Sequence, residues 1–265
     1  MSETSTPESQ LVAGLLDARR NRVPLAIPFD VAGLSPARGY EIQRLHELAT
    51  LQAYGGRRIG TKLGGGTMAE LAALGLSGPF RGPIFSSFTH ASPARLARGD
   101  FFLCAAEAEI AVRIGRDIGG EARDYGREEV ADAVAAVMPA IELADSRWAD
   151  YKAASAAAVL ADLGYAGAWI SGEPLDDWRA IDLAQLPVAL SCNGMEIARG
   201  IGMRAMGDPL LGVCAALSEL GREGRGMKAG EIVTTGTCTV PYIARAGDSL
   251  LADFGPLGQV RVDLT

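Results

Sequence analysis

Two glutamates, Glu107 and Glu109, lie two residues apart in a segment whose apolar residues alternate with a period of two. On a β-strand this spacing puts both side chains on one face with their Cα atoms about 6.6 Å apart, so the carboxylates can converge on one cation. An ordinary solvated face is the alternative. The neighbours on that face are apolar, however: Phe101, Leu103, Ala105 and Ala111. Burying two uncompensated carboxylates costs on the order of several kcal/mol, which a divalent cation would offset.

A third acid, Glu142, stands alone in the apolar segment 138–144. Three carboxylates completed by water suit Mg²⁺ or Mn²⁺ and do not suit zinc. The chain has two histidines, His46 and His90, which excludes a His-rich zinc site, and neither lies in a nucleophile-elbow context. We expect His46 on the surface of a helix and His90 in a loop, where it could be structural or functional.

The glycine-rich segment GTKLGGG, residues 60–66, carries one cation, Lys62, which we place on a short strand or turn. The segment lacks the spacing of a P-loop or of a dinucleotide-binding motif, so nucleotide binding is disfavoured. The alternative is that its glycines only turn the chain. A second cluster, TTGTCT at 234–239, could offer hydroxyl and backbone N–H groups to an anionic ligand, or cover the end of a strand.

The elements that hold these residues follow from cap signals and periodicity. Thr6, Ser35, Thr67 and Asp208 are predicted N-caps. The predicted helices cover 7–20, 36–54, 68–74, 128–137, 149–162 and 209–220. Strands are predicted at 101–114, at 166–170 and in short pieces from 228 to the end, and Asn193-Gly194 predicts a hairpin.

Composition narrows the class of protein. With 48% hydrophobic and 22% charged residues the chain is globular, and its net charge of −7 disfavours nucleic acid and anionic lipid as partners. The cysteines are widely spaced among apolar or small residues, which predicts buried thiols in a reducing compartment: Cys104, Cys192, Cys214 and Cys238. No signal sequence or apolar stretch of ~18 residues is present, so we expect a cytoplasmic protein.

The predicted fold class is mixed α/β. At 265 residues the chain can bury a substantial core. We expect one domain over 1–265, with a helical N-terminal portion at 1–55 and a strand-rich core at 56–265. The apolar, Ala-rich and Trp-containing segment from Trp148 to Trp178 predicts a surface that a homo-oligomer would cover.

From about Gly60 to the C-terminus the chain resembles the 2-oxopent-4-enoate hydratase family, within the fumarylacetoacetase-like superfamily. The segments that carry the resemblance follow one another in the family's order, and this ordered set is more specific than any one motif. They are GTKLGGGTMAELAALGL, AEAEIAVRIGRDI, MPAIELADSR, SCNGMEIARGIGMRAMGDPL, AGEIVTTGTCTVPYIARAGD and ADFGPLG.

The resemblance implies a core like the fumarylacetoacetase C-terminal domain and a divalent ion, Mg²⁺ or Mn²⁺, held by Glu107, Glu109 and Glu142. It also implies a catalytic or substrate-positioning role for Lys62. Three further residues match family segments that contact substrate: Thr235, Gly236 and Asp162. The chain departs from the family pattern at Phe80, where the family often has an acid, and at Leu163, where it has Asn after the Asp; both departures bear on substrate and proton transfer.

The chemistry that the resemblance implies is hydration of a 2-hydroxy-2,4-dienoate or 2-oxo-enoate to a 4-hydroxy-2-oxo acid, in the catabolism of aromatic compounds. A first alternative is metal-dependent decarboxylation of a 2-oxo-enedioate, as in 4-oxalocrotonate decarboxylases. A second is cleavage of an acylpyruvate, which needs a base, with His90 the one candidate. A third is a catalytically silent scaffold subunit. The family also assembles, so a related decarboxylase or a downstream aldolase is a possible partner beside the small 2-oxo acid substrate.

Overall fold

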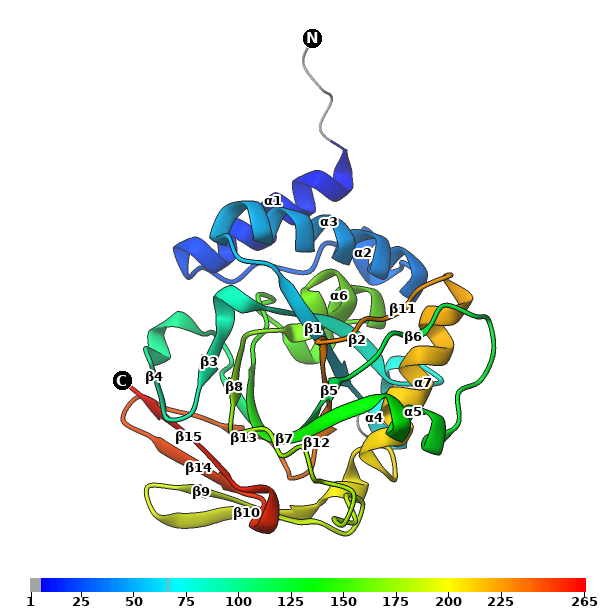
Figure 1. Ribbon diagram of the computed structural model, residues 1–265. Helices are drawn as coiled ribbons and strands as arrows, with labels where there is room; N and C mark the ends of the chain where they lie inside the picture. Colours follow the sequence, from blue (N-terminus) through cyan, green and yellow to red (C-terminus); the bar gives the residue numbers. More distant parts are fainter. Residues whose placement is uncertain (1–5, 66) are drawn as a thin grey trace.

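The computed structural model describes residues 6–65 and 67–265 and confirms the mixed α/β class (Figure 1). Three helices precede the first strand, and the remaining helices lie between strands. Their bounds are α1 (Pro7–Asn21), α2 (Phe29–Ala32), α3 (Pro36–Tyr54), α4 (Met68–Leu74), α5 (Arg127–Ala133), α6 (Ala156–Ala161) and α7 (Pro209–Arg222).

An eight-stranded sheet forms the centre of the molecule. Its strands run in the order β2 (Phe80–Phe85), β1 (Arg58–Gly64), β12 (Ile232–Thr237), β5 (Ala105–Ile114), β7 (Val134–Ala144), β8 (Ala168–Ser171) and β3 (Thr89–Ala91), and β13 (Tyr242–Ile243) also pairs with β5. The pairing of β1 with β12 is parallel, whereas β5 pairs with β7 in antiparallel register.

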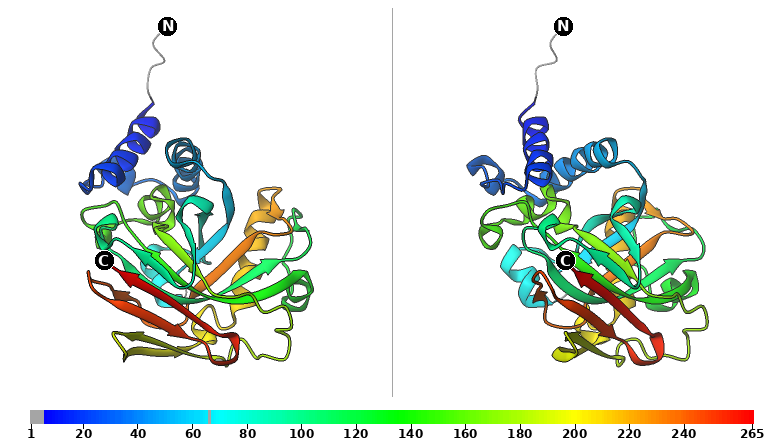
Figure 2. Two further views of the ribbon diagram at one scale, coloured as in Figure 1. Left: turned by 60° about the vertical axis from the view of Figure 1, so that its left-hand side comes forward. Right: turned by 90° about the vertical axis from the view of Figure 1, so that its left-hand side faces the viewer.

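A second sheet of five strands lies on one side of the large sheet, and α1, α2 and α3 lie on the opposite side (Figure 2). The strand order in this second sheet is β10 (Met195–Ile201), β9 (Pro187–Cys192), β14 (Ser249–Asp253), β15 (Gln259–Leu264) and β4 (Ala94–Leu96). A small pair joins β11 (Gly226–Met227) to β6 (Ile118–Gly119). The main core fills the space between the two sheets and α7, because the inward residues of their strands are apolar.

The predicted cap signals are confirmed by hydrogen bonds. The Thr6 side chain accepts from the N–H of Ser9 at the start of α1, and Ser35 accepts from Arg38 at the start of α3. Thr67 and Glu70 form a reciprocal capping box at α4. The Asn193-Gly194 hairpin is also confirmed, between β9 and β10. Local chemistry therefore sets most of these boundaries.

Three predicted boundaries are wrong. The strand expected from Phe101 begins at Ala105, and the helix expected to reach Val137 ends at Ala133, where β7 begins. The sequence at that junction is alanine and valine, which fit both structures. The long helix expected over 149–162 is instead a short 3₁₀ turn at Tyr151–Ala153 followed by α6, because Ser155 starts a new helix by capping the N–H of Ala158.

The burial of the apolar and sulfur side chains tests two expectations. All four cysteines are free and buried, as predicted. The premise for an oligomer is wrong: Trp148 and Trp178 are 2% and 4% exposed, and α6 is buried under α3, so this segment packs within the chain itself. Within residues 6–65 and 67–265, no helix combines the length and apolarity that crossing a bilayer requires.

His46 is buried and does not lie on the helix surface, contrary to expectation. It is 2% exposed, and its Nδ1 lies 2.9 Å from the carbonyl oxygen of Ala161. A carbonyl can only accept, so Nδ1–H donates. The residue points inward because α3 packs along α6, which covers the face that looked polar. Burial lowers the pKa of His46 to about 3, despite the hydrogen bond to Ala161.

This pKa makes a stability prediction. Unfolded His46 titrates near pH 6.5 whereas the folded ring stays neutral to about pH 3, so acidification favours the unfolded state. From pH 7 to pH 5 this group alone should remove about 2 kcal/mol of unfolding free energy. Urea unfolding of the metal-free parent and of His46→Gln at both pH values measures it. Equal pH dependence in the two proteins would show that the ring is charged or solvated in the folded state.

Candidate metal and substrate site

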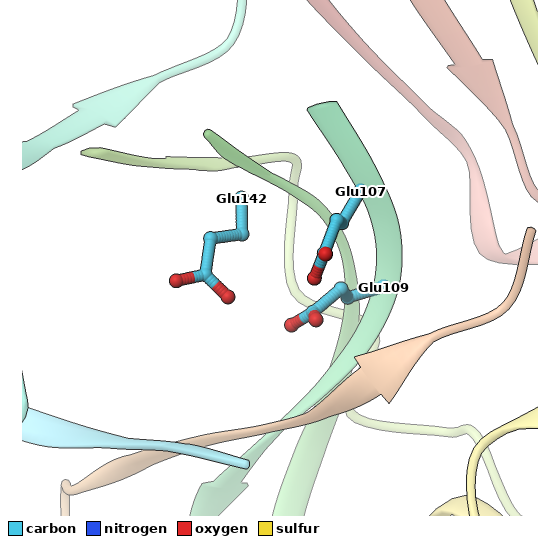
Figure 3. Close-up of side chains that lie close together, drawn as sticks. All are labelled: Glu107, Glu109 and Glu142. Atoms are coloured by element: carbon cyan, nitrogen blue, oxygen red, sulfur yellow. The ribbon is translucent and has the colours of Figure 1, made fainter. Parts of the chain in front are cut away.

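Three glutamates meet on the large sheet (Figure 3). Glu107 and Glu109 lie on β5, and Glu142 lies on β7 directly opposite Glu107 in the antiparallel register. Each residue offers one carboxylate oxygen, and these oxygens all lie within 4.8 Å of one another. The period of two along β5 and the strand pairing together produce the cluster that the sequence predicts.

Lys62 reaches the cluster from β1. Two strands, β12 and β5, separate β1 from β7 in the sheet order, which in a flat sheet would place the backbones about 14 Å apart. Its Nζ nevertheless lies 3.2 Å from Oε1 of Glu142 and donates to the carbonyl oxygen of Gly164 at 2.8 Å. The sheet is therefore curved, and its concave face brings the ammonium group to the acids.

The three carboxylates are largely shielded from solvent. Glu109 is 0% exposed and Glu142 is 3% exposed, while Glu107 is half-buried. Both oxygens of Glu109 and Oε2 of Glu142 are buried and lack a hydrogen-bond partner among the described residues. Buried carboxylate oxygens are almost always satisfied in folded proteins, so this set requires a cation or protons.

Burial is also the main cause of the raised pKa values of the three glutamates. Burial, reinforced by the charge of Glu142, raises the pKa of Glu107 to about 7. Burial and the two neighbouring carboxylates raise the pKa of Glu109 well above its usual value, and burial raises that of Glu142 against the pull of Lys62. Burial disfavours the Lys62 ammonium, but the three carboxylates outweigh this and raise its pKa. Lys62 is therefore a cation.

The donor set fits a divalent cation. Three ionised carboxylates and one ammonium group leave two negative charges, which one divalent ion neutralises. All-oxygen ligands suit Mg²⁺ or Mn²⁺, and the unpartnered oxygens of Glu109 and Glu142 are free to coordinate. Water or a substrate would have to supply the remaining positions.

A pocket of about 420 Å³ opens beside the cluster. Lys62, Glu107, Gly236 and Thr237 bring polar groups to it, while most of its wall is apolar. The apolar lining includes Leu63, Leu74, Phe80, Leu103, Ala105, Val159, Pro241 and Ile243. An apolar cleft with a few convergent polar groups is the usual form of a small-molecule site.

The structure places the remaining predicted site residues as follows. Gly236 lines the pocket, but Thr235 does not, since its buried hydroxyl donates to the carbonyl oxygen of Ile110 at 2.8 Å. Asp162 also lies outside the pocket, where it is fully buried and its carboxylate accepts from Nε of Arg147 at 2.5 Å. The substrate contacts predicted for Thr235 and Asp162 stay predictions.

The two departures from the family pattern have different surroundings. Phe80 lines the pocket with its ring centroid 5.5 Å from Nζ of Lys62, so it adds an apolar wall that favours the cation. Leu163 is fully buried and does not line the pocket. Neither described histidine lines it. His90 is half-buried on β3, where it pairs with Ile170 of β8, so the expectation of a loop was wrong. His46 packs against α6. The histidine expected to act as base in acylpyruvate cleavage is therefore missing from the described lining.

Sequence reasoning missed several lining residues. Tyr151 and Tyr165 flank the pocket from the segments around α6, and Glu70 and Lys152 line it as exposed charges. Thr237 lies in the TTGTCT cluster, which the sequence did single out. The tyrosines carry no spacing signal, because they come from short turns whose conformation depends on the packing around them.

The chain is similar in sequence to proteins of known families. Residues 80–265 match the family model for the fumarylacetoacetate (FAA) hydrolase C-terminal domain. The chain is 28% identical over 264 residues to 2-keto-4-pentenoate hydratase 1 of Dechloromonas aromatica (strain RCB), covering 98% of each chain. It is 28% identical over 206 residues to a 4-oxalocrotonate decarboxylase of Pseudomonas putida, covering 78% of this chain and 77% of that one.

The solved structures agree on the fold. The 4-oxalocrotonate decarboxylase from Pseudomonas putida G7, complexed with magnesium and adipate, superposes with a TM-score of 0.89 at 24% identity over 99% of this chain and 100% of that one. A fumarylpyruvate hydrolase from Pseudomonas aeruginosa, in complex with Mn²⁺ and pyruvate, has a TM-score of 0.57 at 16% identity over 80% and 91% of the two chains.

Proposed function

The chain belongs to the fumarylacetoacetate hydrolase C-terminal family, and from this premise we propose that it is a divalent-metal-dependent hydro-lyase of 2-oxo acids. Its reaction is the addition of water to a 2-hydroxy-2,4-dienoate, or the 2-oxo-enoate formed from it, to give a 4-hydroxy-2-oxo acid. The single observation that carries the proposal is the buried cluster of Glu107, Glu109 and Glu142, which contacts Lys62 at one wall of the pocket.

The relatives support the cation and the reaction class. Names of 2-keto-4-pentenoate hydratases and 4-oxalocrotonate decarboxylases recur among them, and one neighbouring structure contains magnesium. Glu107, Glu109 and Glu142 would hold Mg²⁺ or Mn²⁺ here. When bound, the ion supplies Lewis-acid stabilisation of negative charge on the oxygens of a 2-oxo acid.

The chain's own residues do the rest of the work. Lys62 stays protonated, so its ammonium group stabilises the negative charge that develops on the substrate when the dienol rearranges. The hydroxyl proton is lost, carbon takes up a proton, and the product is a 2-oxo-3-enoate. Water then adds across this activated double bond, OH to C4 and H to C3. The apolar wall of the pocket keeps bulk water away from the rest of the substrate.

Decarboxylation of a 2-oxo-enedioate is the second candidate, favoured by one residue. A dicarboxylate needs a second cation at its far end, and Lys152 is the other lysine or arginine among the described residues that line the pocket. Lys152 is exposed, whereas the inner lining is apolar. An apolar wall favours an uncharged tail, which a monocarboxylate has. We therefore put hydration first.

An assay with both substrate classes tests the proposal. Purified protein is incubated with Mg²⁺ and either a 2-hydroxy-2,4-dienoate or a 2-oxo-enedioate, while dienol absorbance and released carbon dioxide are followed. We expect metal-dependent loss of dienol absorbance without carbon dioxide. Carbon dioxide released from the enedioate would make decarboxylation the reaction. Absence of turnover with every member of both classes would favour the silent scaffold subunit.

We also propose that the protein is a homo-oligomer, on a different basis from the segment around α6. Strand β10 is an edge of the smaller sheet and carries exposed apolar side chains, with Met195 71% and Ile197 38% exposed. Exposed edges of this kind invite pairing. Sedimentation at micromolar concentration should give a mass at least twice that of one chain, and a single-chain mass would rule the oligomer out.

A further inference from the structure

Arg147 is a buried cation with no part in the site so far. It follows β7 in the chain, its side chain is 1% exposed, and it does not line the pocket. A guanidinium group is always charged, so its burial requires partners that satisfy its N–H groups. The identity of those partners shows what the residue holds in place.

The hydrogen-bond partners of Arg147 are Asp162 and Ala166, which lie just before and just after one turn of the chain. Arg147 donates from Nε to Oδ1 of Asp162 at 2.5 Å and from Nη2 to the carbonyl oxygen of Asp162 at 2.6 Å. Its Nη1 donates to the carbonyl oxygen of Ala166 at 3.0 Å, and its backbone N–H donates to Oδ2 of Asp162 at 2.8 Å. The rigid fork thus connects the two ends of the segment Leu163–Tyr165.

This segment is a left-handed turn. Leu163, Gly164 and Tyr165 have φ angles of 57°, 60° and 64°. Side chains disfavour this region because Cβ approaches the following carbonyl oxygen, and here two of the three residues are not glycine. Such a backbone persists only where its surroundings fix it. Arg147 and Asp162 supply that fixation from both ends of the turn.

The turn places the carbonyl oxygen of Gly164 beside the ammonium group of Lys62. Gly164 accepts from Nζ of Lys62 at 2.8 Å, and Tyr165 lines the pocket. The fit is close: a Cβ on Gly82 of β2 would lie 2.4 Å from the carbonyl oxygen of Leu163 and 3.0 Å from Cδ of Lys62. An ammonium group has three N–H donors. Glu142 and Gly164 take two directions, so the third direction is fixed and left for a ligand.

We propose that Arg147 and Asp162 are positioning residues: by fixing the left-handed turn they hold the Gly164 carbonyl against Lys62 and so aim its free N–H at the substrate. The inference rests on the proposed function for the effect on turnover. The buried Arg147–Asp162 ion pair then has a positioning role in place of the substrate contact predicted for Asp162. Neither residue lines the pocket.

A double-mutant cycle with Lys62 tests the proposal. Arg147→Lys keeps the buried charge but cannot bridge Asp162 and Ala166, so we expect kcat to fall tenfold or more with KM changed less than threefold. In a Lys62→Met background the same substitution should change kcat by less than twofold, because the group it positions is gone. Trp148→Phe is the matched control: it removes a buried bond to Ala158 of α6 beside the turn and should leave kcat within twofold.

A second readout does not use activity. The N–H groups of Tyr165 and Ala166 are bonded within the turn, to the carbonyl oxygens of Asp162 and Leu163. Hydrogen–deuterium exchange of the metal-free protein should accelerate at least tenfold there in Arg147→Lys and in Asp162→Asn, and not in Trp148→Phe.

Two results would overturn the proposal: an Arg147 effect on kcat that is as large without Lys62 as with it, or turn amides whose exchange is unchanged in both variants. Should Arg147→Lys fail to fold, Asp162→Asn carries both measurements. A parent protein without turnover would count against the proposed function, and the exchange measurement would still decide whether the pair fixes the turn.

Discussion

Replacing Lys62 by methionine is expected to lower kcat by roughly 10²-fold or more, the usual scale for loss of a group that stabilises charge in the transition state. The ammonium group lies 3.2 Å from Glu142 and has a raised pKa, so it is the cation that offsets charge developing on the substrate. Methionine keeps the unbranched side chain as far as Cε and removes the charged ammonium group. Steady-state kinetics with the dienoate substrate measures the loss, and calorimetry should show Mg²⁺ affinity within a few-fold of the parent.

Arg58→Met is the matched control for Lys62. Arg58 lies on the same strand four residues earlier, does not line the pocket, and bonds to Gly60 and Thr61. We expect kcat to stay within a few-fold of the parent. If Lys62→Met retains activity while Arg58→Met abolishes it, the catalytic cation has been assigned to the wrong position in β1.

Glu109→Gln should have the largest effect on metal binding, lowering Mg²⁺ affinity by roughly 10²-fold or more, because it removes a charged ligand with two unpartnered oxygens. The same change should not destabilise the metal-free protein. Burial raises the pKa of Glu109 well above its usual value, so its ionised form is costly there and the neutral amide avoids that cost. Calorimetry and thermal unfolding of metal-stripped protein measure the two effects.

Glu70→Gln controls for loss of negative charge near the pocket. Glu70 lines the pocket from α4 but is exposed and lies outside the three-carboxylate group. Its replacement should leave Mg²⁺ affinity within a few-fold of the parent. Equal affinities for Glu109→Gln and the parent would mean that the cation binds elsewhere.

The cluster of three carboxylates was predictable because its signals are local. Glu107 and Glu109 share a strand face through the period of two, and Glu142 is an isolated acid in an apolar run. Lys62 was found through its glycine-rich surroundings and the family resemblance. The caps at Thr6, Ser35 and Thr67 are likewise local, since each side chain bonds a backbone N–H a few residues later.

Other features depend on contacts between distant segments, and the sequence did not reveal them. The approach of Lys62 to Glu142 depends on the curvature of the sheet across β12 and β5. The left-handed turn at Leu163–Tyr165 has leucine and tyrosine where glycine would have given a signal. His46 was misplaced for the same reason, because only the packing of α3 on α6 shows which face of the helix is covered.

The central claim is that Glu107, Glu109 and Glu142 bind one divalent cation at which Lys62 and the pocket hold a 2-oxo acid. Crystals of the protein grown with Mn²⁺ and pyruvate, recorded near the manganese absorption edge, test it most directly. The account predicts one anomalous peak within coordination distance of all three carboxylates, with pyruvate bound beside Lys62. A peak away from these carboxylates, or no peak at saturating Mn²⁺ in an active preparation, would contradict it.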